Sequence, residues 1–285
     1  MYRITLRVVA MSLFTILALL SLRLVTAGAP VNLLVSNVRD TSFTVSWLTA
    51  VEEVGQVQLI GGASVDDVRG ADFRGVTHYV VVTGLQPGQP YQFDIISGAE
   101  KHDNAGMHWT VRTGATLAAP TPDPIVGQVK NPDGASNGDA IVFFTIQRDG
   151  SISAPLSALA AERDGGFFQV NLSDARGLSD PDSYFVPVTN DHLTIQAISA
   201  HGIGALTVEV GDPRLRASEP HQAIVIPLRT AMETPTIVVR TPLPTAAPTS
   251  TTPSAEVNAL WLGLGIGVLI VVGVIVVAVL FVWRK

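Results

Sequence analysis

The densest group of side chains that could bind a metal or a ligand lies in the stretch AEKHDNAGMHW, residues 99–109. Its candidate residues are Lys101, His102, Asp103, Asn104 and His108. Imidazole nitrogens and carboxylate oxygens are common ligands of divalent metals, and binding residues often lie on loops held by a rigid scaffold. The stretch is therefore a candidate metal or partner site. The alternative is a polar loop tip that only faces water.

Other patterns that carry chemistry are missing from the sequence. It contains no GxSxG elbow, no P-loop, no HExxH pair and no dinucleotide fingerprint. It also contains no cysteine, which excludes thiolate metal sites and disulfide scaffolds and favours a bacterial source. Aspartates at 149, 164, 180, 182 and 191 do not have the spacing of an EF-hand, and we interpret them as turn residues. We therefore predict a non-catalytic protein without metal or cofactor.

The N-terminal segment, residues 1–27, has the organisation of an export signal. Two arginines precede an apolar stretch from Val8 to Leu22, and small residues follow at Val25-Thr26-Ala27. A positive start, an apolar middle and a small-residue cleavage site are the three parts of a secretory signal. We predict cleavage before Gly28, and an uncleaved anchor is the alternative.

The C-terminal segment has the composition of a membrane anchor. Residues 259–283 contain no charged or strongly polar side chain. A helix that rises about 1.5 Å per residue covers about 33 Å between Trp261 and Trp283, close to the roughly 30 Å of a hydrocarbon core. These two tryptophans suit the membrane interfaces, and Arg284 and Lys285 form a positive cytoplasmic flank. We predict a single-pass type I protein of the cell membrane, with its N-terminal part extracellular and a tail of residues 284–285.

Glycines in the predicted anchor raise the question of self-association. Gly263 and Gly267 have the GxxxG spacing that allows close packing of two membrane helices. A weak dimer through these residues is one interpretation, and the glycine-rich composition of many anchors is the other.

The part between the signal and the anchor is acidic. It holds 13 lysines and arginines against all 24 aspartates and glutamates, a net charge of −11. Nucleic acid requires a basic face, so we exclude it as a partner. An acidic exterior mainly favours solubility, and the expected partner is an extracellular protein or glycan.

Between the two ends the sequence predicts two β-sandwich domains in tandem, residues 28–113 and 124–229, joined by a linker at 114–123. Alternating runs such as Phe43–Trp47 and Leu193–Ala197 recur along both blocks, with Gly, Asp, Asn and Pro between them. Strand signals about 8–12 residues apart are typical of sandwiches. The predicted fold class is therefore all-β.

The first block contains a corner motif. Leu85, Pro87 and Tyr91 lie in the stretch LQPGQPY between two alternating runs, and Trp47 lies on an earlier run. In a two-sheet sandwich, a tyrosine after the crossing can turn its hydroxyl onto the upstream backbone and lock the corner. Leu85 would close the core, Pro87 would preset the turn, and Trp47 would be the central aromatic residue.

These residues resemble a fibronectin type III domain over about 31–113, and they look closest to the module that precedes the catalytic domain of purple acid phosphatases. The metal-ligand motifs of that catalytic domain are missing here, so its activity is not carried over. The resemblance implies an immunoglobulin-like sandwich that serves as a spacer or a binding module.

The second block resembles the carboxypeptidase regulatory-like, or prealbumin-like, β-sandwich. A Gly-x-Val strand, an Asp-Gly turn and a later Asp-Gly-Gly-Phe carry this resemblance. The residues are Gly127, Val129, Asp133, Gly134, Ala140, Val142, Asp164, Gly165 and Phe167. The resemblance implies a second sandwich and no catalytic residue.

Residues 230–258 are predicted to be a disordered stalk. The stretch 234–254 contains five prolines and seven threonines, a composition that cannot bury a core. The whole chain is thus predicted to display two sandwich modules on a cell surface for adhesion, ligand binding or spacing. Two alternatives stay open: an exported hydrolase with a dispersed site in 124–229, and a precursor whose ectodomain is released by proteolysis.

Overall fold

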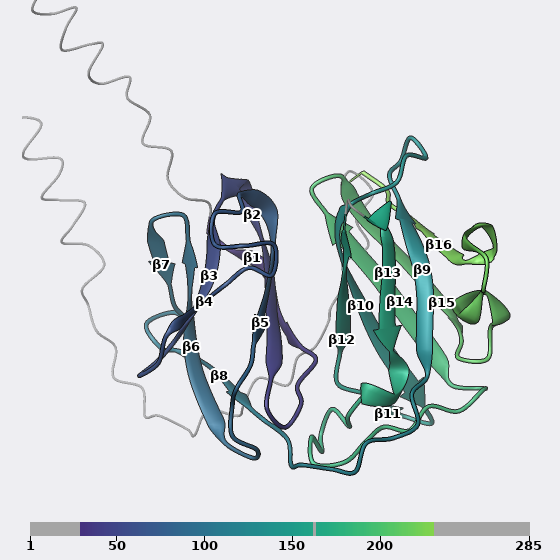
Figure 1. The fold of residues 1–285 in the computed structure, drawn as a ribbon, viewed down its shortest axis with the longest axis horizontal. Coiled ribbons are helices and arrows are strands. Elements are labelled where there is room, and N and C mark those ends of the chain that lie inside the picture. Colours follow the sequence, from purple (N-terminus) through teal and green to yellow (C-terminus); the bar gives the residue numbers. More distant parts are fainter. Residues whose placement is uncertain (1–28, 162–163, 231–285) are drawn as a thin grey trace, which may run out of the picture. The chain divides into compact units, whose positions relative to one another are not determined.

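The computed structural model of the protein describes residues 29–161 and 164–230 (Figure 1). This part of the chain is all-β, as predicted, with short 3-10 turns at Leu172–Asp174, Pro213–Arg216 and Pro220–Gln222. Within it, no helix is long and apolar enough to cross a membrane. The predicted signal, the stalk after Thr230, the anchor and the tail lie outside the described residues.

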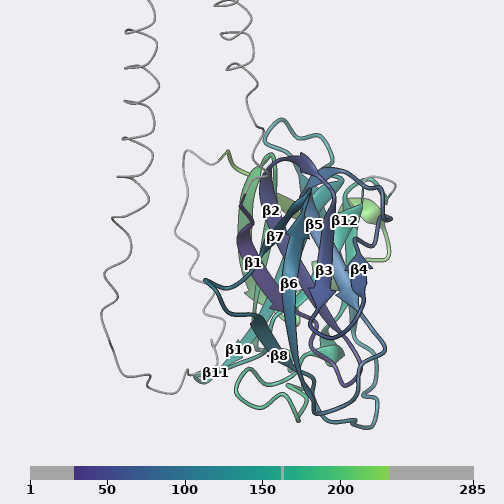
Figure 2. The ribbon, with the colours of Figure 1, turned by 90° about the vertical axis from the view of Figure 1, so that its left-hand side faces the viewer.

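Strands β1 to β8 build the first sandwich from two antiparallel sheets (Figures 1 and 2). One sheet has the order β1-β2-β5. The other has the order β4-β3-β6-β7, and β8 also pairs with β6. The bounds are β1 Val31–Ser36, β2 Phe43–Glu53, β3 Gly55–Leu59, β4 Ser64–Asp66, β5 Gly75–Val82, β6 Pro90–Ser97, β7 Glu100–His102 and β8 Trp109–Arg112.

The core of the first sandwich follows from the alternation of its strands. Val45 and Trp47 of β2 face Phe93 and Ile95 of β6, and all four side chains are fully buried. Successive side chains of a strand point to opposite faces, so every second residue enters the core. Trp47 is the largest of these side chains and belongs to the same hydrophobic cluster.

The crossing between β5 and β6 is closed by the predicted corner residues. The Tyr91 hydroxyl accepts a hydrogen bond from the backbone N–H of Gln86 at 2.7 Å. Leu85 is buried under this turn, and its own N–H donates to the carbonyl of Thr41 at 3.1 Å. Gly88 adopts a left-handed conformation with φ of 67°, which a residue with a Cβ would adopt at a cost. Backbone and side chain thus fix the path of the chain at this corner.

Strands β9 to β16 build the second sandwich. One sheet has the order β11-β10-β14-β15, and β12 also pairs with β10; the other has the order β13-β9-β16, in which β16 runs parallel to β9. The bounds are β9 Pro124–Lys130, β10 Asp139–Arg148, β11 Ser151–Ile152, β12 Leu156–Ala161, β13 Phe167–Asn171, β14 His192–Ser199, β15 Gly202–Glu209 and β16 Ile224–Pro227.

Gly127 explains how the smaller sheet of the second sandwich packs. A Cβ at this position would lie 2.3 Å from the Phe168 ring and 2.7 Å from Ile224. The glycine therefore lets Phe168 lie against the strand backbone, where its ring contacts Phe144 at a centroid distance of 5.4 Å. Phe168 faces the core, while the neighbouring Phe167 is only half-buried.

The two sandwiches also pack against each other, which the tandem arrangement expected from the sequence did not include. Leu34 and Tyr79 of the first sandwich form one buried cluster with Ile141, Phe143 and Ile198 of the second. Strands β5 and β10, which belong to the two facing sheets, are therefore buried on both faces along most of their length. Two-sided burial produces nearly continuous apolar runs instead of alternation, as in AIVFF of β10.

Candidate functional site

Two residues of the predicted ligand loop are engaged with a carboxylate on the neighbouring strand. The Asp94 side chain on β6 is fully buried, with Lys101 Nζ 2.7 Å from its Oδ2 and His108 Nδ1 2.8 Å from its Oδ1. Burial alone would raise the pKa of Asp94, but the hydrogen bonds from Lys101 and His108 outweigh it and hold the pKa below its ordinary value. Lys101 therefore forms an ion pair with this carboxylate, and His108 forms a hydrogen bond with it.

The other three residues of the loop are turned elsewhere. Asp103 Oδ1 accepts from the backbone N–H of Gly106 at 2.9 Å, and Asn104 and Met107 exchange backbone hydrogen bonds. His102 belongs to β7, and its Nε2 is buried without a hydrogen-bond partner. The structure thus splits the predicted set. Among the described residues, no group of three or more His, Asp or Glu side chains is placed to hold a metal ion.

A buried polar cluster lies in the same sandwich and was not predicted from the sequence. His78 is fully buried and stacks on Trp47, with ring centroids 4.9 Å apart. Trp47 Nε1 donates to Ser97 Oγ at 2.9 Å, and Glu53, only 4% exposed, also bonds to Ser97. Three buried side-chain atoms here have no hydrogen-bond partner among the described residues: Glu53 Oε1, His78 Nδ1 and His102 Nε2.

Burial sets the protonation of this cluster. It raises the pKa of Glu53, and it lowers the pKa of His78 to about 4 because a low-dielectric site disfavours the charged form. The Thr49 hydroxyl donates to the Val51 carbonyl at 2.9 Å and lies 3.2 Å from His78 Nε2. The neutral imidazole therefore carries its proton on Nε2, which donates to Thr49.

A second polar cluster joins the two sandwiches, and Asn37 is its centre. Asn37 Nδ2 donates to the carbonyl and the hydroxyl of Ser157, both at 3.0 Å, and Asn37 Oδ1 accepts from the Ser157 N–H at 2.9 Å. The Tyr79 hydroxyl lies 2.9 Å from Ser157 Oγ, and Ser36 Oγ lies 2.7 Å from the same atom. Asn37 has φ of 49°, a conformation that asparagine tolerates better than most residues.

Charged contacts extend this interface. Arg69 Nη1 lies 2.6 Å from Asp139 Oδ1 across the interface, while Asp67 holds the same guanidinium from its own sandwich. At the other end, Arg176 is almost fully buried and donates to the carbonyl of Ala115 at 2.9 Å. Asp182 accepts from the Ala115 N–H at 2.7 Å. The start of the predicted linker is therefore held by a loop of the second sandwich.

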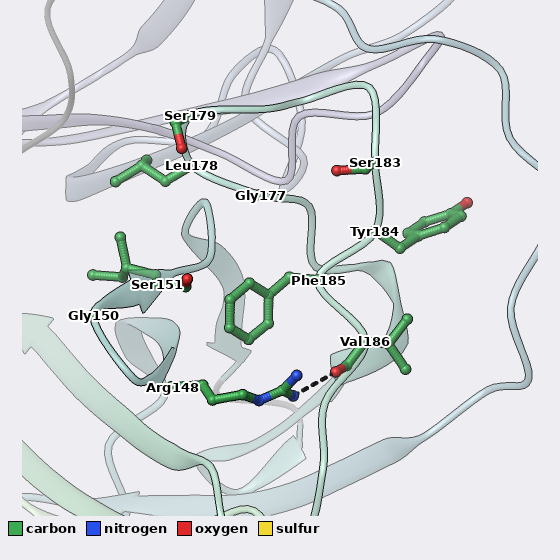
Figure 3. Close-up of a pocket in the computed structure, with 11 residues that line it drawn as sticks. Arg148, Gly150, Ser151, Gly177, Leu178, Ser179, Ser183, Tyr184, Phe185 and Val186 are labelled. Carbon is green, nitrogen blue, oxygen red and sulfur yellow. Dashed lines mark hydrogen bonds between the residues drawn. The ribbon is translucent and has the colours of Figure 1, made fainter.

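A groove of about 620 Å³ opens on the second sandwich (Figure 3). One wall is the turn between β10 and β11, and the other is the loop that precedes β14. Figure 3 shows Phe185 pointing toward Arg148, while Tyr184 points away from it. The lining includes Arg148, Ile152, Leu178, Phe185 and Val186.

The charge inside this groove is balanced. Arg148 binds Asp191 with two hydrogen bonds, at 2.6 and 2.5 Å, and donates to the carbonyl of Val186 at 2.8 Å. The hydrogen bonds from Arg148 lower the pKa of Asp191 because they favour the ionised carboxylate. The groove therefore has an ion pair whose Arg148 lies over the Phe185 ring, 5.3 Å from its centroid, and its remaining lining mixes apolar side chains with serines.

Residues 28–112 match the family model of the fibronectin type III domain. These residues form a fibronectin type III domain. A crystal structure of chicken CNTN1 FN1-FN3 domains is similar at 16% identity, covering 72% of this chain and 68% of that chain, with a TM-score of 0.23. No curated protein sequence matches the chain.

The match covers the corner and the core of the fibronectin type III domain but not the second sandwich. The resemblance of residues 124–229 to the carboxypeptidase regulatory-like sandwich stays a prediction, as do the kinship with the purple acid phosphatase module and the bacterial source. The residues that would mark a membrane anchor, Trp261, Gly263, Gly267, Trp283, Arg284 and Lys285, lie outside the described part of the chain.

Proposed function

We propose that the chain is a non-catalytic, membrane-anchored surface protein that presents two sandwiches as one rigid body for binding an extracellular partner. The observation that carries the proposal is the contact of Asn37 and Tyr79 with the buried Ser157. Six polar atoms of these three residues are hydrogen-bonded to one another there. Breaking this contact would leave buried donors and acceptors unpaired, which is costly. Such a joint keeps two modules at a fixed angle.

The sequence supports the surface location. The signal-like residues 1–27 and the uncharged residues 259–283 flank the acidic part, an arrangement that exports the middle and retains the end. The fibronectin type III match of residues 28–112 suits a binding or spacing module, although a fold alone does not define a ligand.

Trypsin treatment of intact cells tests the location. Arg240 is the only basic residue between Arg229 and the predicted anchor, so we expect cutting after Arg240 or Arg229 and release of a fragment that holds both sandwiches. Protection in intact cells with cutting in lysed cells would place residues 28–258 inside the cell and overturn the proposal.

A substrate screen tests the absence of catalysis. Purified residues 29–230 should not hydrolyse phosphate esters, carboxyl esters or glycosides above the rate in buffer. Turnover that a single histidine or aspartate substitution abolishes would overturn the non-catalytic assignment.

A further inference from the structure

The groove of the second sandwich is formed by an unusually long connection. Residues 175–191 separate the turn at Leu172–Asp174 from β14 and contain no strand of their own. Irregular loops longer than about 12–15 residues are uncommon in compact domains and usually have a function. This loop is nevertheless fixed, because Phe185 N–H donates to the Ala175 carbonyl at 2.8 Å and Arg148 holds Asp191. A fixed long loop is a suitable wall for a binding site.

The mouth of the groove exposes aliphatic side chains to water, beside Ser151, Ser179 and Ser183. Ile152 is 40% exposed, Val186 is 63% exposed, and the nearby Val188 is 47% exposed. Single exposed aliphatic residues are ordinary, but several at the rim of one groove indicate a contact surface. Phe185 and Leu178 continue this apolar surface inward.

Two exposed acidic residues adjoin the lining of the groove. The charge of Arg148 is balanced by Asp191. Asp149 and Asp180 are exposed, and each is next in sequence to a lining residue. The predicted ectodomain as a whole carries a net charge of −11. A partner that combines an aliphatic side chain with a positive charge would match both properties.

The strand register places this groove at one end of the second sandwich. The chain leaves the sandwich at the other end. In the β10–β14 pair, Ile141 stands beside Ile198 at one end, and Gln147 stands beside His192 at the other. Arg229, near the last described residue, bonds to Ile203 at the Ile198 end, whereas Arg148 belongs to the His192 end. The groove therefore faces away from the exit of the chain toward its C-terminus.

We propose that this groove binds an extended peptide segment in which an aliphatic side chain is followed by a lysine or an arginine. The aliphatic side chain enters between Phe185, Ile152 and Val186, and the cationic side chain lies by Asp149 or Asp180. This inference rests on the proposed display function and names the class of partner that the displayed body binds.

The direct test is binding of a synthetic peptide to purified residues 29–230, measured by calorimetry. These residues contain both cores and the surface that joins them, so the fragment keeps its folding contacts. The probe is Thr-Ile-Val-Val-Arg-Thr, the sequence of residues 236–241, and its control is the same peptide with Glu in place of Arg. We expect saturable binding of the Arg peptide and at least about tenfold weaker binding of the Glu peptide.

Matched variants locate the site. Val186→Asn should weaken binding of the Arg peptide about tenfold or more because it places an unpaired amide, without a new charge, on the apolar part of the mouth. Val225→Asn changes a valine of β16 that is 44% exposed and should change binding less than about twofold. Asp149→Asn should reduce both the affinity for the Arg peptide and its salt dependence; asparagine tolerates the φ of 44° at this position.

Three outcomes would overturn the groove as a peptide site. They are no saturable binding of the Arg peptide, equal binding of the Glu peptide, and equal weakening by the Val186 and Val225 variants. The measurement uses purified protein and no cells, so its failure is distinguishable from failure of surface display, which the trypsin experiment tests.

Discussion

The two sandwiches differ in what they bury. The fibronectin type III domain encloses His78, Glu53 and Ser97 beside its central Trp47. The core between the sheets of the second sandwich is apolar, and its buried charged residues, Arg176 and Asp191, lie in the long loop at one end. The first interior therefore contains titratable groups beside its core, whereas the buried carboxylate of the second sandwich, Asp191, lies in the end loop and is paired with Arg148.

This difference has a consequence for stability. Burying an unpaired polar atom costs free energy, and the first sandwich holds several such atoms around Glu53 and His78. One of its sheets is also covered by the second sandwich, through Leu34 and Tyr79. We infer that the second sandwich is the more stable body and that the first depends on it.

The largest expected effect comes from the core of the second sandwich. Phe144 is 1% exposed and packs on Phe168, so Phe144→Ala should destabilise residues 29–230 by about 3–5 kcal/mol. Both tryptophans of this fragment, Trp47 and Trp109, lie in the first sandwich. Their fluorescence therefore reports whether damage to the second sandwich unfolds the first.

We expect the fluorescence midpoint in urea to fall in the Phe144→Ala variant. The matched control is Val225→Ala, an exposed position of the same sandwich, which should leave the midpoint nearly unchanged. An unchanged midpoint for Phe144→Ala, together with loss of β-structure by circular dichroism, would show that the sandwiches unfold independently.

The next largest expected effect is a loss of stability of the first sandwich as the pH is lowered. The pKa of His78 is about 4 in the folded protein against an ordinary value of 6.5, so between these values the unfolded chain binds a proton that the folded chain does not. Stability therefore falls as the pH is lowered from about 6.5 to about 4, by about 3 kcal/mol in total, and is fully present above 6.5.

Urea unfolding of residues 29–230 between pH 7 and pH 4 measures this loss. His78→Gln should be less stable at pH 7 but should show a flatter dependence on pH. His192→Gln, an exposed histidine of β14, should keep the slope of the parent. An unchanged slope in His78→Gln would contradict the assignment of this loss to His78.

The sequence predicted the elements that depend on local pattern. Alternation and turn residues were enough for the all-β class, and the spacing of Leu85, Pro87 and Tyr91 was enough for the fibronectin type III corner. These signals work because side-chain period and turn chemistry are local properties of the chain.

The contacts between the sandwiches could not be predicted in the same way. Asn37 and Ser157 are 120 residues apart, and no sequence motif beside either residue indicates that the other is its partner. A partial signal existed in the continuous apolar run of β10, since two-sided burial removes alternation. The contacts of the loop at 101–108 could not be predicted for a related reason, because the carboxylate that engages Lys101 and His108 is Asp94, on the preceding strand β6.

A smaller effect is expected at the joint between the sandwiches. Asn37→Ala removes the side-chain hydrogen bonds to Ser157 and places alanine at φ of 49°, and it should cost about 2 kcal/mol. Asn37→Gly separates the loss of the hydrogen bonds from the backbone strain, because glycine accepts that φ without strain but lacks the amide.

Thermal unfolding of both variants measures the two losses of stability. Asn190→Ala, in an exposed loop, is the control. Equal stability of Asn37→Ala and the parent would contradict a structural role for this joint.

The smallest expected effect is at the corner of the fibronectin type III domain. Tyr91→Phe removes only the hydroxyl that accepts from the Gln86 N–H at 2.7 Å. Gln86 is exposed, so water can replace the lost acceptor, and the expected cost is about 1 kcal/mol, below that of a fully buried donor.

The control is Tyr184→Phe, whose hydroxyl makes no hydrogen bond within the described part of the chain and whose loss should be neutral. Urea midpoints of residues 29–230 distinguish the two. If Tyr91→Phe is as neutral as Tyr184→Phe, the corner is held by Leu85 and the turn backbone alone, and the hydroxyl does not lock it.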